Sequence, residues 1–169
     1  LELAKSLDDV VAHMGRERAR SSIYFASKGL FPNSKQQLKI KRMETDKAIK
    51  GLKDVLHKYP NLITPKLQQI MGYINKINRV RLGINNFKLS FKDWFINYYT
   101  KMDGQIYNYE AELFQVKTGS FASLTTATTP TIEKLLVAKQ NLRKAIENWG
   151  RQRGYLSYVT TKNTPIDDD

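Results

Sequence analysis

Apolar residues recur at steps of three and four along most of the chain, which is the period of one face of an α-helix. No stretch of useful length alternates with the period of two that a half-buried strand requires. The first long stripe runs through Leu7, Val11, Met14, Arg18, Ser21 and Phe25. The last runs through Ile132, Leu135, Lys139, Leu142, Ile146, Trp149, Arg153 and Leu156. We therefore predict an all-α protein without a β-sheet.

Helix start and stop signals divide the first third of this pattern into two helices. We expect the first helix over residues 3–28, because Gly29 follows it and glycine is a typical helix stop. Ser34, with Gln37 three residues later, forms a capping-box pattern. It predicts a second helix that begins there and ends before Tyr59.

Two further start signals predict the middle of the chain. Thr64-Pro65 places a capping residue before a proline in the first helical position, so a third helix should begin there. This helix should weaken around Gly83–Asn86. Ser90 with Asp93 then restarts a fourth helix, rich in aromatic residues, that we expect to reach about residue 117.

A Gly/Ser/Thr-rich stretch over residues 118–129 is predicted to be a long loop before the last helix. Thr129-Pro130 begins that helix, which should continue to about residue 161. Residues 1–161 would then form one domain, an up-and-down antiparallel bundle of four to five helices. Residues 162–169, with a proline and three aspartates, are predicted to be a linker or disordered tail.

A Gly-Arg-(Glu/Gln)-Arg-small pattern occurs near each end of the chain, and its second arginine falls on an apolar stripe. These two residues are Arg18 and Arg153. An arginine at a core position needs a partner, because burying an uncompensated charge is costly. The partner is either a carboxylate of this chain or an anion that both arginines share, unless the guanidinium groups snorkel to the surface. The candidate carboxylates are Glu17, Glu44, Asp46 and Glu147.

The positions of the two arginines predict how the first and last helices run. Arg18 lies 10 residues before residue 28, and Arg153 lies 8 before residue 161. At 1.5 Å per residue these separations are ~15 and ~12 Å. If both arginines share one layer of the bundle, the two helices run parallel, with their C-terminal ends together. That arrangement requires an even number of chain reversals, which a five-helix bundle supplies.

Composition argues against several functional classes. No window approaches the ~18 uninterrupted apolar residues of a membrane span. The absence of cysteine excludes disulfides and thiolate metal sites. His13 and His57 stand alone, and no histidine is placed to activate a serine. We therefore expect no metal, no cofactor and no enzymatic activity.

The net charge of +12 is spread along the chain, with one basic cluster at Lys35–Arg42. Diffuse positive charge draws small anions toward a domain. The cluster also leaves an alternative open, a basic helical module that binds nucleic acid or a protein partner. Such binding would weaken steeply with added salt.

Four runs of the sequence resemble the nitrate- and nitrite-sensing domain of bacterial receptors. The first two are Glu17-Arg18-Ala19-x-Ser21-x-x-Tyr24-x-Ala26-Ser27-x-Gly29 and Leu38-x-x-x-Arg42-x-x-Thr45-Asp46-x-Ala48. The others are Tyr98-Tyr99-Thr100 and Gly150-x-x-Arg153-Gly154, so the resemblance covers about residues 10–160. The chain departs from the family pattern at Ala19, where glycine is usual, and at Gln152, where glutamate is usual. Both arginines are retained.

The resemblance implies a ligand-sensing domain of a bacterial transmembrane receptor, of the chemoreceptor or sensor-kinase type. It implies that nitrate or nitrite binds between two helices and signals by helix displacement. A periplasmic location and a homodimer are expected with it. The chain opens without methionine and reads as a piece of a longer protein, so we expect the membrane helices and the output domain in flanking segments.

The resemblance also implies a set of site residues. The expected ligand-binding residues are Arg18, Ala19, Ser22, Arg153, Gly154 and Ser157. A guanidinium fork can give nitrate two parallel hydrogen bonds. Asp46 is expected to orient one of the arginines from the second helix. If the backbone N–H of Ala19 or Gly154 binds the anion, the helix must loosen there into a π-type bulge.

Overall fold

The computed structural model describes residues 2–121 and 129–163 of the 169-residue chain. The helices are α1 (Glu2–Ala26), α2 (Ser34–Lys58), the 3₁₀ turn η1 (Pro60–Leu62), α3 (Pro65–Ile74), α4 (Ile77–Asn85), α5 (Phe91–Trp94), the π-helix η2 (Phe95–Thr100), α6 (Lys101–Phe121) and α7 (Thr129–Lys162). These two ranges contain no β-strand, so the all-α prediction is confirmed.

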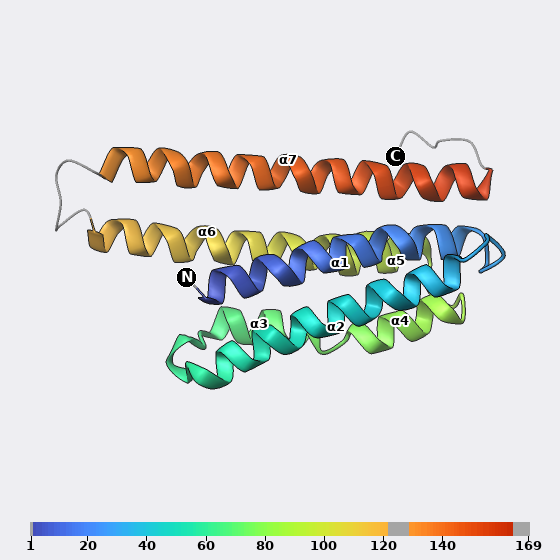
Figure 1. The fold of residues 1–169 in the computed structure, drawn as a ribbon, viewed down its shortest axis with the longest axis horizontal. Coiled ribbons are helices and arrows are strands. Elements are labelled where there is room, and N and C mark those ends of the chain that lie inside the picture. The colour runs from blue at the N-terminus through green and yellow to red at the C-terminus, as the bar shows by residue number, and fades with distance from the viewer. Residues whose placement is uncertain (1, 122–128, 164–169) are drawn as a thin grey trace.

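The described helices form an up-and-down bundle (Figure 1). Each passage of the chain along the bundle is called a leg, and there are five in the described residues. α1 and α2 are antiparallel, and α3 with α4 makes the next leg, which runs in the direction of α1. α5, η2 and α6 return as one continuous leg. α7 then runs parallel to α1 and packs against it. The parallel first and last helices agree with the residue count made from the sequence.

The hydrophobic core lies among the first four legs. Its fully buried members include Leu7, Val10, Met14, Leu52, Leu67, Ile84, Trp94 and Tyr99. Among the described side chains of α7, Val159 is the buried hydrophobic one. α7 therefore lies against a core that the other legs build.

Three predicted helix ends are confirmed. Gly29 takes a left-handed conformation (φ 77°) after α1, and its N–H donates to the Tyr24 carbonyl at 2.8 Å. The Thr64 hydroxyl accepts from the Leu67 N–H at 3.2 Å and caps α3. Ser90 and Asp93 form the predicted capping box at α5.

Other helix ends differ from the prediction. The capping position of α2 is Asn33, at φ 58°, rather than Ser34, because the left-handed Asn33 already turns the chain into the helix. The third leg breaks at Asn75–Lys76, before the predicted weak point. α6 reaches Phe121, so residues 118–121 are helical and not loop. A single helical glycine there costs only ~1 kcal/mol. The rest of the predicted loop (122–128) and the end of the tail (164–169) lie outside the described residues.

The apolar stripe of α7 does not face the core, contrary to the sequence prediction. Its described apolar members are largely exposed, with relative exposures of 65% for Leu135, 62% for Leu142, 61% for Ile146 and 80% for Trp149. Arg153 is exposed as well. The pattern identified an apolar face correctly, but a pattern does not show whether this chain covers that face.

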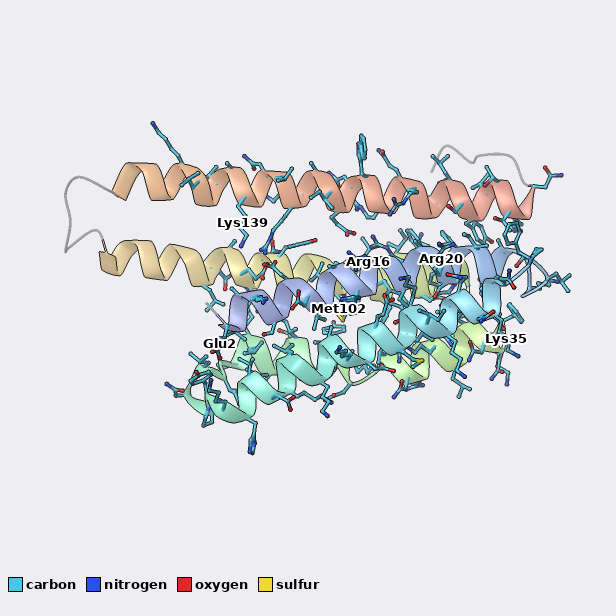
Figure 2. The ribbon with its side chains drawn as sticks, in the orientation of Figure 1. Glu2, Arg16, Arg20, Lys35, Met102 and Lys139 are labelled. Carbon is cyan, nitrogen blue, oxygen red and sulfur yellow. The ribbon has the colours of Figure 1, made fainter. Side chains whose placement is uncertain are left out.

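α7 instead docks through small and charged residues and through two tyrosines that pack on Phe91. Gly154 is buried, and Arg143, Glu147 and Gly150 are partly buried. Arg143 Nη1 donates to Glu110 at 2.5 Å, and the same side chain pairs with Asp8 of α1. The Lys139 side chain also points from α7 toward the bundle, with Nζ 3.6 Å from Asp8 (Figure 2). Ion pairs therefore hold the first half of α7 to α1 and α6.

None of the helices in the described part of the chain is both long enough and apolar enough to cross a bilayer.

Candidate functional site

Arg18 is the buried cation at the centre of the candidate site. Its relative exposure is 1%, as the stripe on the first helix predicted. Nη1 donates to Glu147 Oε1 at 2.7 Å, to Thr100 Oγ1 at 3.0 Å and to Asp103 Oδ2 at 3.2 Å. These acceptors lie on η2, α6 and α7, so one nitrogen of α1 joins three other elements.

The remaining nitrogens of Arg18 are not engaged in the same way. Nε is buried and has no hydrogen-bond partner. Nη2 lies beneath α7, where a Cβ added to Gly150 would be 3.6 Å away, and it donates to no described residue. Two nitrogens of this guanidinium therefore have no acceptor among the described residues.

The π-helix η2 places the side chains of Tyr99 and Thr100 against α1. A π-turn inserts an extra residue into the helical ladder, which changes the side-chain register at that point. Thr100 Oγ1 donates to the Phe95 carbonyl at 2.8 Å and accepts from Arg18. Tyr99, one residue earlier, donates its hydroxyl to Glu17 Oε1 at 2.6 Å. The adjacent residues Tyr99 and Thr100 thus hold the adjacent side chains of Glu17 and Arg18.

Glu17 is fully buried and paired with Arg81 of α4. Arg81 Nε and Nη2 donate to its two carboxylate oxygens at 2.8 and 2.7 Å, a bidentate fork. Arg81 Nη1 also donates to Asp46 at 2.6 Å. The structure therefore places Asp46 beside Arg81 and not beside Arg18 or Arg153.

Arg81 was missed in the sequence analysis, although the signal was available. It stands at helical spacing with Ile77 and Ile84, both buried, so it is another arginine on an apolar stripe. Burial alone would lower the pKa of Arg81, but its hydrogen bonds to Glu17 and Asp46 and the charge of Glu17 raise it. The pair fixes Glu17 and leaves Arg18 to other partners.

Asp103 is the second residue that the sequence did not indicate. It is fully buried, and its Oδ1 has no hydrogen-bond partner. Burial raises the pKa of Asp103 well above its usual range, the nearby Glu147 raises it further, and Arg18 opposes both. Arg18 thus faces two carboxylates, and burial favours the neutral form of one of them.

A cavity of about 690 Å³ opens beside Arg18, between α1 and α7. Gly15 and Arg16 line it from α1, and Tyr107 lines it from α6. The lining from α7 includes Glu147, Trp149, Gly150, Gln152, Arg153, Leu156, Ser157 and Thr160. The structure therefore brings the two predicted arginines to one cavity.

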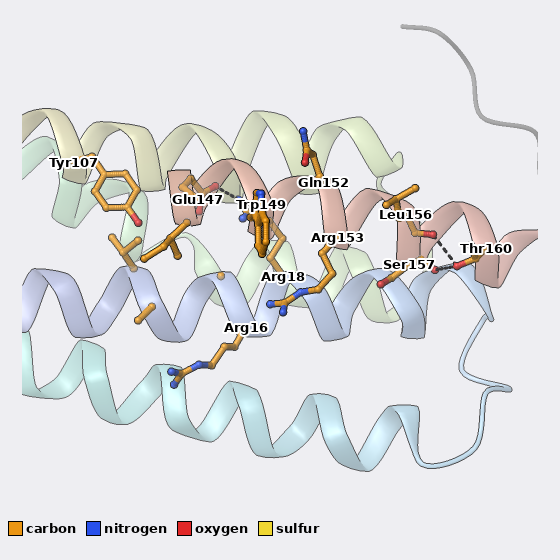
Figure 3. A pocket seen from close by; sticks show the side chains of 15 residues that line it. Arg16, Arg18, Tyr107, Glu147, Trp149, Gln152, Arg153, Leu156, Ser157 and Thr160 are labelled. Atoms are coloured by element: carbon orange, nitrogen blue, oxygen red, sulfur yellow. Dashed lines mark hydrogen bonds and ion pairs between the residues drawn. The ribbon is translucent and has the colours of Figure 1, made fainter. Parts of the chain in front are cut away.

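Arg153 enters this cavity from the opposite helix. Figure 3 shows its side chain reaching from α7 toward α1, while Arg18 reaches from α1 toward α7. No hydrogen bond or ion pair joins Arg153 to another described residue. The core position predicted for Arg153 is wrong, because its stripe is exposed, but its direction leaves it available to an anion.

The other predicted site residues have more varied positions. Ser157 lines the cavity. Ser22 is buried, and its hydroxyl donates to the Arg18 carbonyl at 3.1 Å. Gly154 packs against Phe95, since an added Cβ would lie 2.9 Å from that ring. Ala19 lies in α1 and does not line the cavity.

The π-type bulge considered for Ala19 and Gly154 does not occur there. α1 and α7 are regular α-helices at both positions, so each backbone N–H serves its own helix. The π-helix is instead η2, which contacts Arg18 through Thr100. Side chains alone are therefore offered to a ligand by α1 and α7.

Comparison with known proteins gives one match. The family model described as nitrate and nitrite sensing matches residues 9–168. No curated protein and no solved structure matches the chain.

Proposed function

Because the chain belongs to the nitrate and nitrite sensing family, we propose that it binds nitrate or nitrite in the cavity between α1 and α7, as the sensing domain of a bacterial transmembrane receptor. One observation carries the choice of site. Arg18, whose Nε and Nη2 have no acceptor among the described residues, and Arg153, which has no described partner, line the same cavity from α1 and α7.

The chemistry of the cavity suits a small planar monoanion. Each guanidinium can give such an anion two parallel hydrogen bonds, and the two arginines come from helices that run parallel. Ser157 adds a hydroxyl to the lining, whereas Ser22 supports the backbone of Arg18. Gly154 contributes close packing of α7, and Ala19 makes no contact with the cavity, so neither binds the anion directly.

An anion bound by both arginines would join α1 to α7. Binding energy would then favour one placement of α7 against α1, because a ligand shifts a conformational equilibrium by its differential affinity for the two states. Ion pairs hold the first half of α7, and its second half rests on the rings of Tyr155 and Tyr158, which pack against Phe91. The cavity lies between these two points of attachment and α1. A displacement of α7 is the signal that we propose.

The receptor context follows from the family and from the exposed face of α7. We propose a periplasmic domain of a chemoreceptor or sensor kinase, held in the membrane by flanking segments. The exposed apolar residues Leu135, Leu142, Ile146, Trp149 and Leu156 follow one another at steps of seven, four, three and seven, which fits the heptad spacing of helix–helix association. A homodimer that packs these faces together would remove the stripe from water.

The alternative role of Lys35–Arg42 in binding nucleic acid has less support. Within this run Leu38 is buried, Lys41 Nζ bonds to Glu44 at 2.9 Å, and Arg42 Nη1 bonds to Asn85 at 2.8 Å. Several of these residues therefore serve the fold. The family is also a sensor family and not an enzyme family.

A thermal-shift screen against sodium salts tests the proposal. Nitrate and nitrite should raise the melting temperature, since a ligand at 100 times its dissociation constant adds ~2.7 kcal/mol to stability. Chloride at the same ionic strength should produce a smaller shift. Equal shifts with all salts would contradict a specific site.

A further inference from the structure

Glu147 binds Arg18 at Nη1, beside the Nε and Nη2 donors that the proposed ligand would use. Its Oε1 lies 2.7 Å from Arg18 Nη1, the shortest of the three hydrogen bonds of that nitrogen. Glu147 also lines the cavity, and its side chain is 14% exposed, whereas Asp103 is fully buried. Of the two carboxylates on Arg18, Glu147 is the one that can leave toward solvent.

A carboxylate and nitrate are alike to a guanidinium. Both are planar, trigonal and singly charged, and both offer oxygens in the plane of the fork. We propose, as a deepening of the proposed function, that Glu147 is a tethered competitor of the anion, so that nitrate binds by displacing its carboxylate from Arg18. Glu147 then sets the affinity of the site.

The charges around Glu147 support displacement. Glu147 contacts Arg18 of α1, lies near Asp103 and Tyr107 of α6, and lines the same cavity as Arg153. An anion placed beside Arg18 while Glu147 remained there would meet a like charge at close range. A like charge within ~4–6 Å opposes binding by an amount comparable to a pKa shift of one unit or more. Exchange avoids that repulsion, because one monoanion replaces another.

Exchange also moves the point at which α7 is held. With Glu147 on Arg18, α7 is tied to α1 at residue 147. With an anion between Arg18 and Arg153, the tie lies at residue 153, six residues or ~9 Å farther along the helix. The competition thus couples occupancy of the site to the placement of α7.

The competition has a measurable consequence. If the Glu147 carboxylate leaves Arg18 for only a fraction of the time, the apparent affinity for nitrate is reduced in proportion to that fraction. Glu147→Gln keeps the shape and the acceptor oxygen but removes the charge that competes with nitrate. We expect this variant to bind nitrate at least about tenfold more tightly than the wild type.

The test is isothermal titration of sodium nitrate into the wild-type domain, Glu147→Gln and Glu112→Gln. Glu112 is an exposed residue of α6 whose partner is Lys66, and it does not line the cavity. The same chemical change there should leave the affinity within about twofold. Glu147→Ala serves as a second variant, and circular dichroism melting checks that each variant is folded.

The outcomes separate this inference from the proposed function. Tighter binding by Glu147→Gln than by the wild type, or binding seen only in that variant, supports the competition. Equal or weaker binding by both folded Glu147 variants overturns it and leaves the nitrate site intact. If neither the wild type nor the Glu147 variants bind nitrate, the proposed function itself fails.

Discussion

Gly154 of α7 lies so close to Phe95 of η2 that a Cβ at position 154 would be 2.9 Å from the aromatic ring. Phe95 has little room to move away. It is 1% exposed, stacks on Phe91 at 4.7 Å between ring centroids, and lies under the Arg18 guanidinium. The glycine therefore sets how closely the last helix approaches the π-helix.

Gly154→Ala should destabilise the domain. The new methyl group would push α7 away from η2, and overpacking of this kind costs ~1–3 kcal/mol. Gly51→Ala is the matched control, because an added Cβ at that exposed position of α2 meets nothing within 4 Å. It should stabilise the helix by ~0.5–1 kcal/mol. Urea unfolding of both variants measures the difference, and equal stability of the two would contradict the close contact.

Arg81→Ala should be strongly destabilising. It leaves the buried carboxylate of Glu17 with Tyr99 as its hydrogen-bond donor and with Arg42 Nε, 3.8 Å away, as its nearest cation. Removing one partner of a buried ion pair costs ~3–5 kcal/mol. Lys58→Ala breaks the exposed pair with Glu2 and should change stability by less than ~1 kcal/mol. Guanidinium unfolding measures both values. A loss at Arg81 no larger than that at Lys58 would show that Glu17 is not held by this fork.

Asp103 should make stability depend on pH. Its pKa in the folded chain is raised by burial, so the folded state binds this proton more tightly than the unfolded state. The stabilisation is fully present below the unfolded pKa and is lost as pH rises through the raised folded value. Asp103→Asn should reduce this decline in unfolding free energy as the pH rises above the usual aspartate pKa of about 4. An unchanged pH profile in the variant would assign the dependence to another group.

Helix order, the burial of Arg18 and the parallel first and last helices could be predicted from local patterns. Glu147 was among the candidate partners of Arg18 and does bind it. Thr100 and Asp103 could not be predicted, because they lie 82 and 85 residues away in sequence. The π-turn that presents Thr100 has no periodic signal either. The apolar stripe of α7 was identified correctly, but its exposure was not predicted. The spacing of Leu142 and Trp149 is the same whether this chain or another one covers them.

The exposed face of α7 should control self-association. Leu135→Asn with Leu142→Asn removes two large apolar side chains of the stripe that do not line the cavity, so it should shift the domain from dimer to monomer. Leu30→Asn is the control, because Leu30 is 86% exposed but lies in the turn after α1. Sedimentation velocity gives the oligomeric state. A wild-type monomer, or a dimer unaffected by the double substitution, would rule out this face as the interface.

Two exposed arginines of α7 provide the cleanest test of the anion site, because neither supports the core. Arg153 lines the cavity, whereas Arg151 bonds to Asn148 and does not. Arg18→Ala would abolish the site but would also strand Asp103 and Glu147, so a loss of binding there has two explanations.

The most direct measurement is therefore nitrate binding by isothermal titration calorimetry to Arg153→Ala and Arg151→Ala. The loss of a guanidinium that holds the anion removes a charged hydrogen bond of ~1.5–3 kcal/mol, which is about tenfold or more in affinity. Arg153→Ala should weaken binding by that factor, and Arg151→Ala should match the wild type. Equal affinities for the two variants would contradict an anion site shared by Arg18 and Arg153.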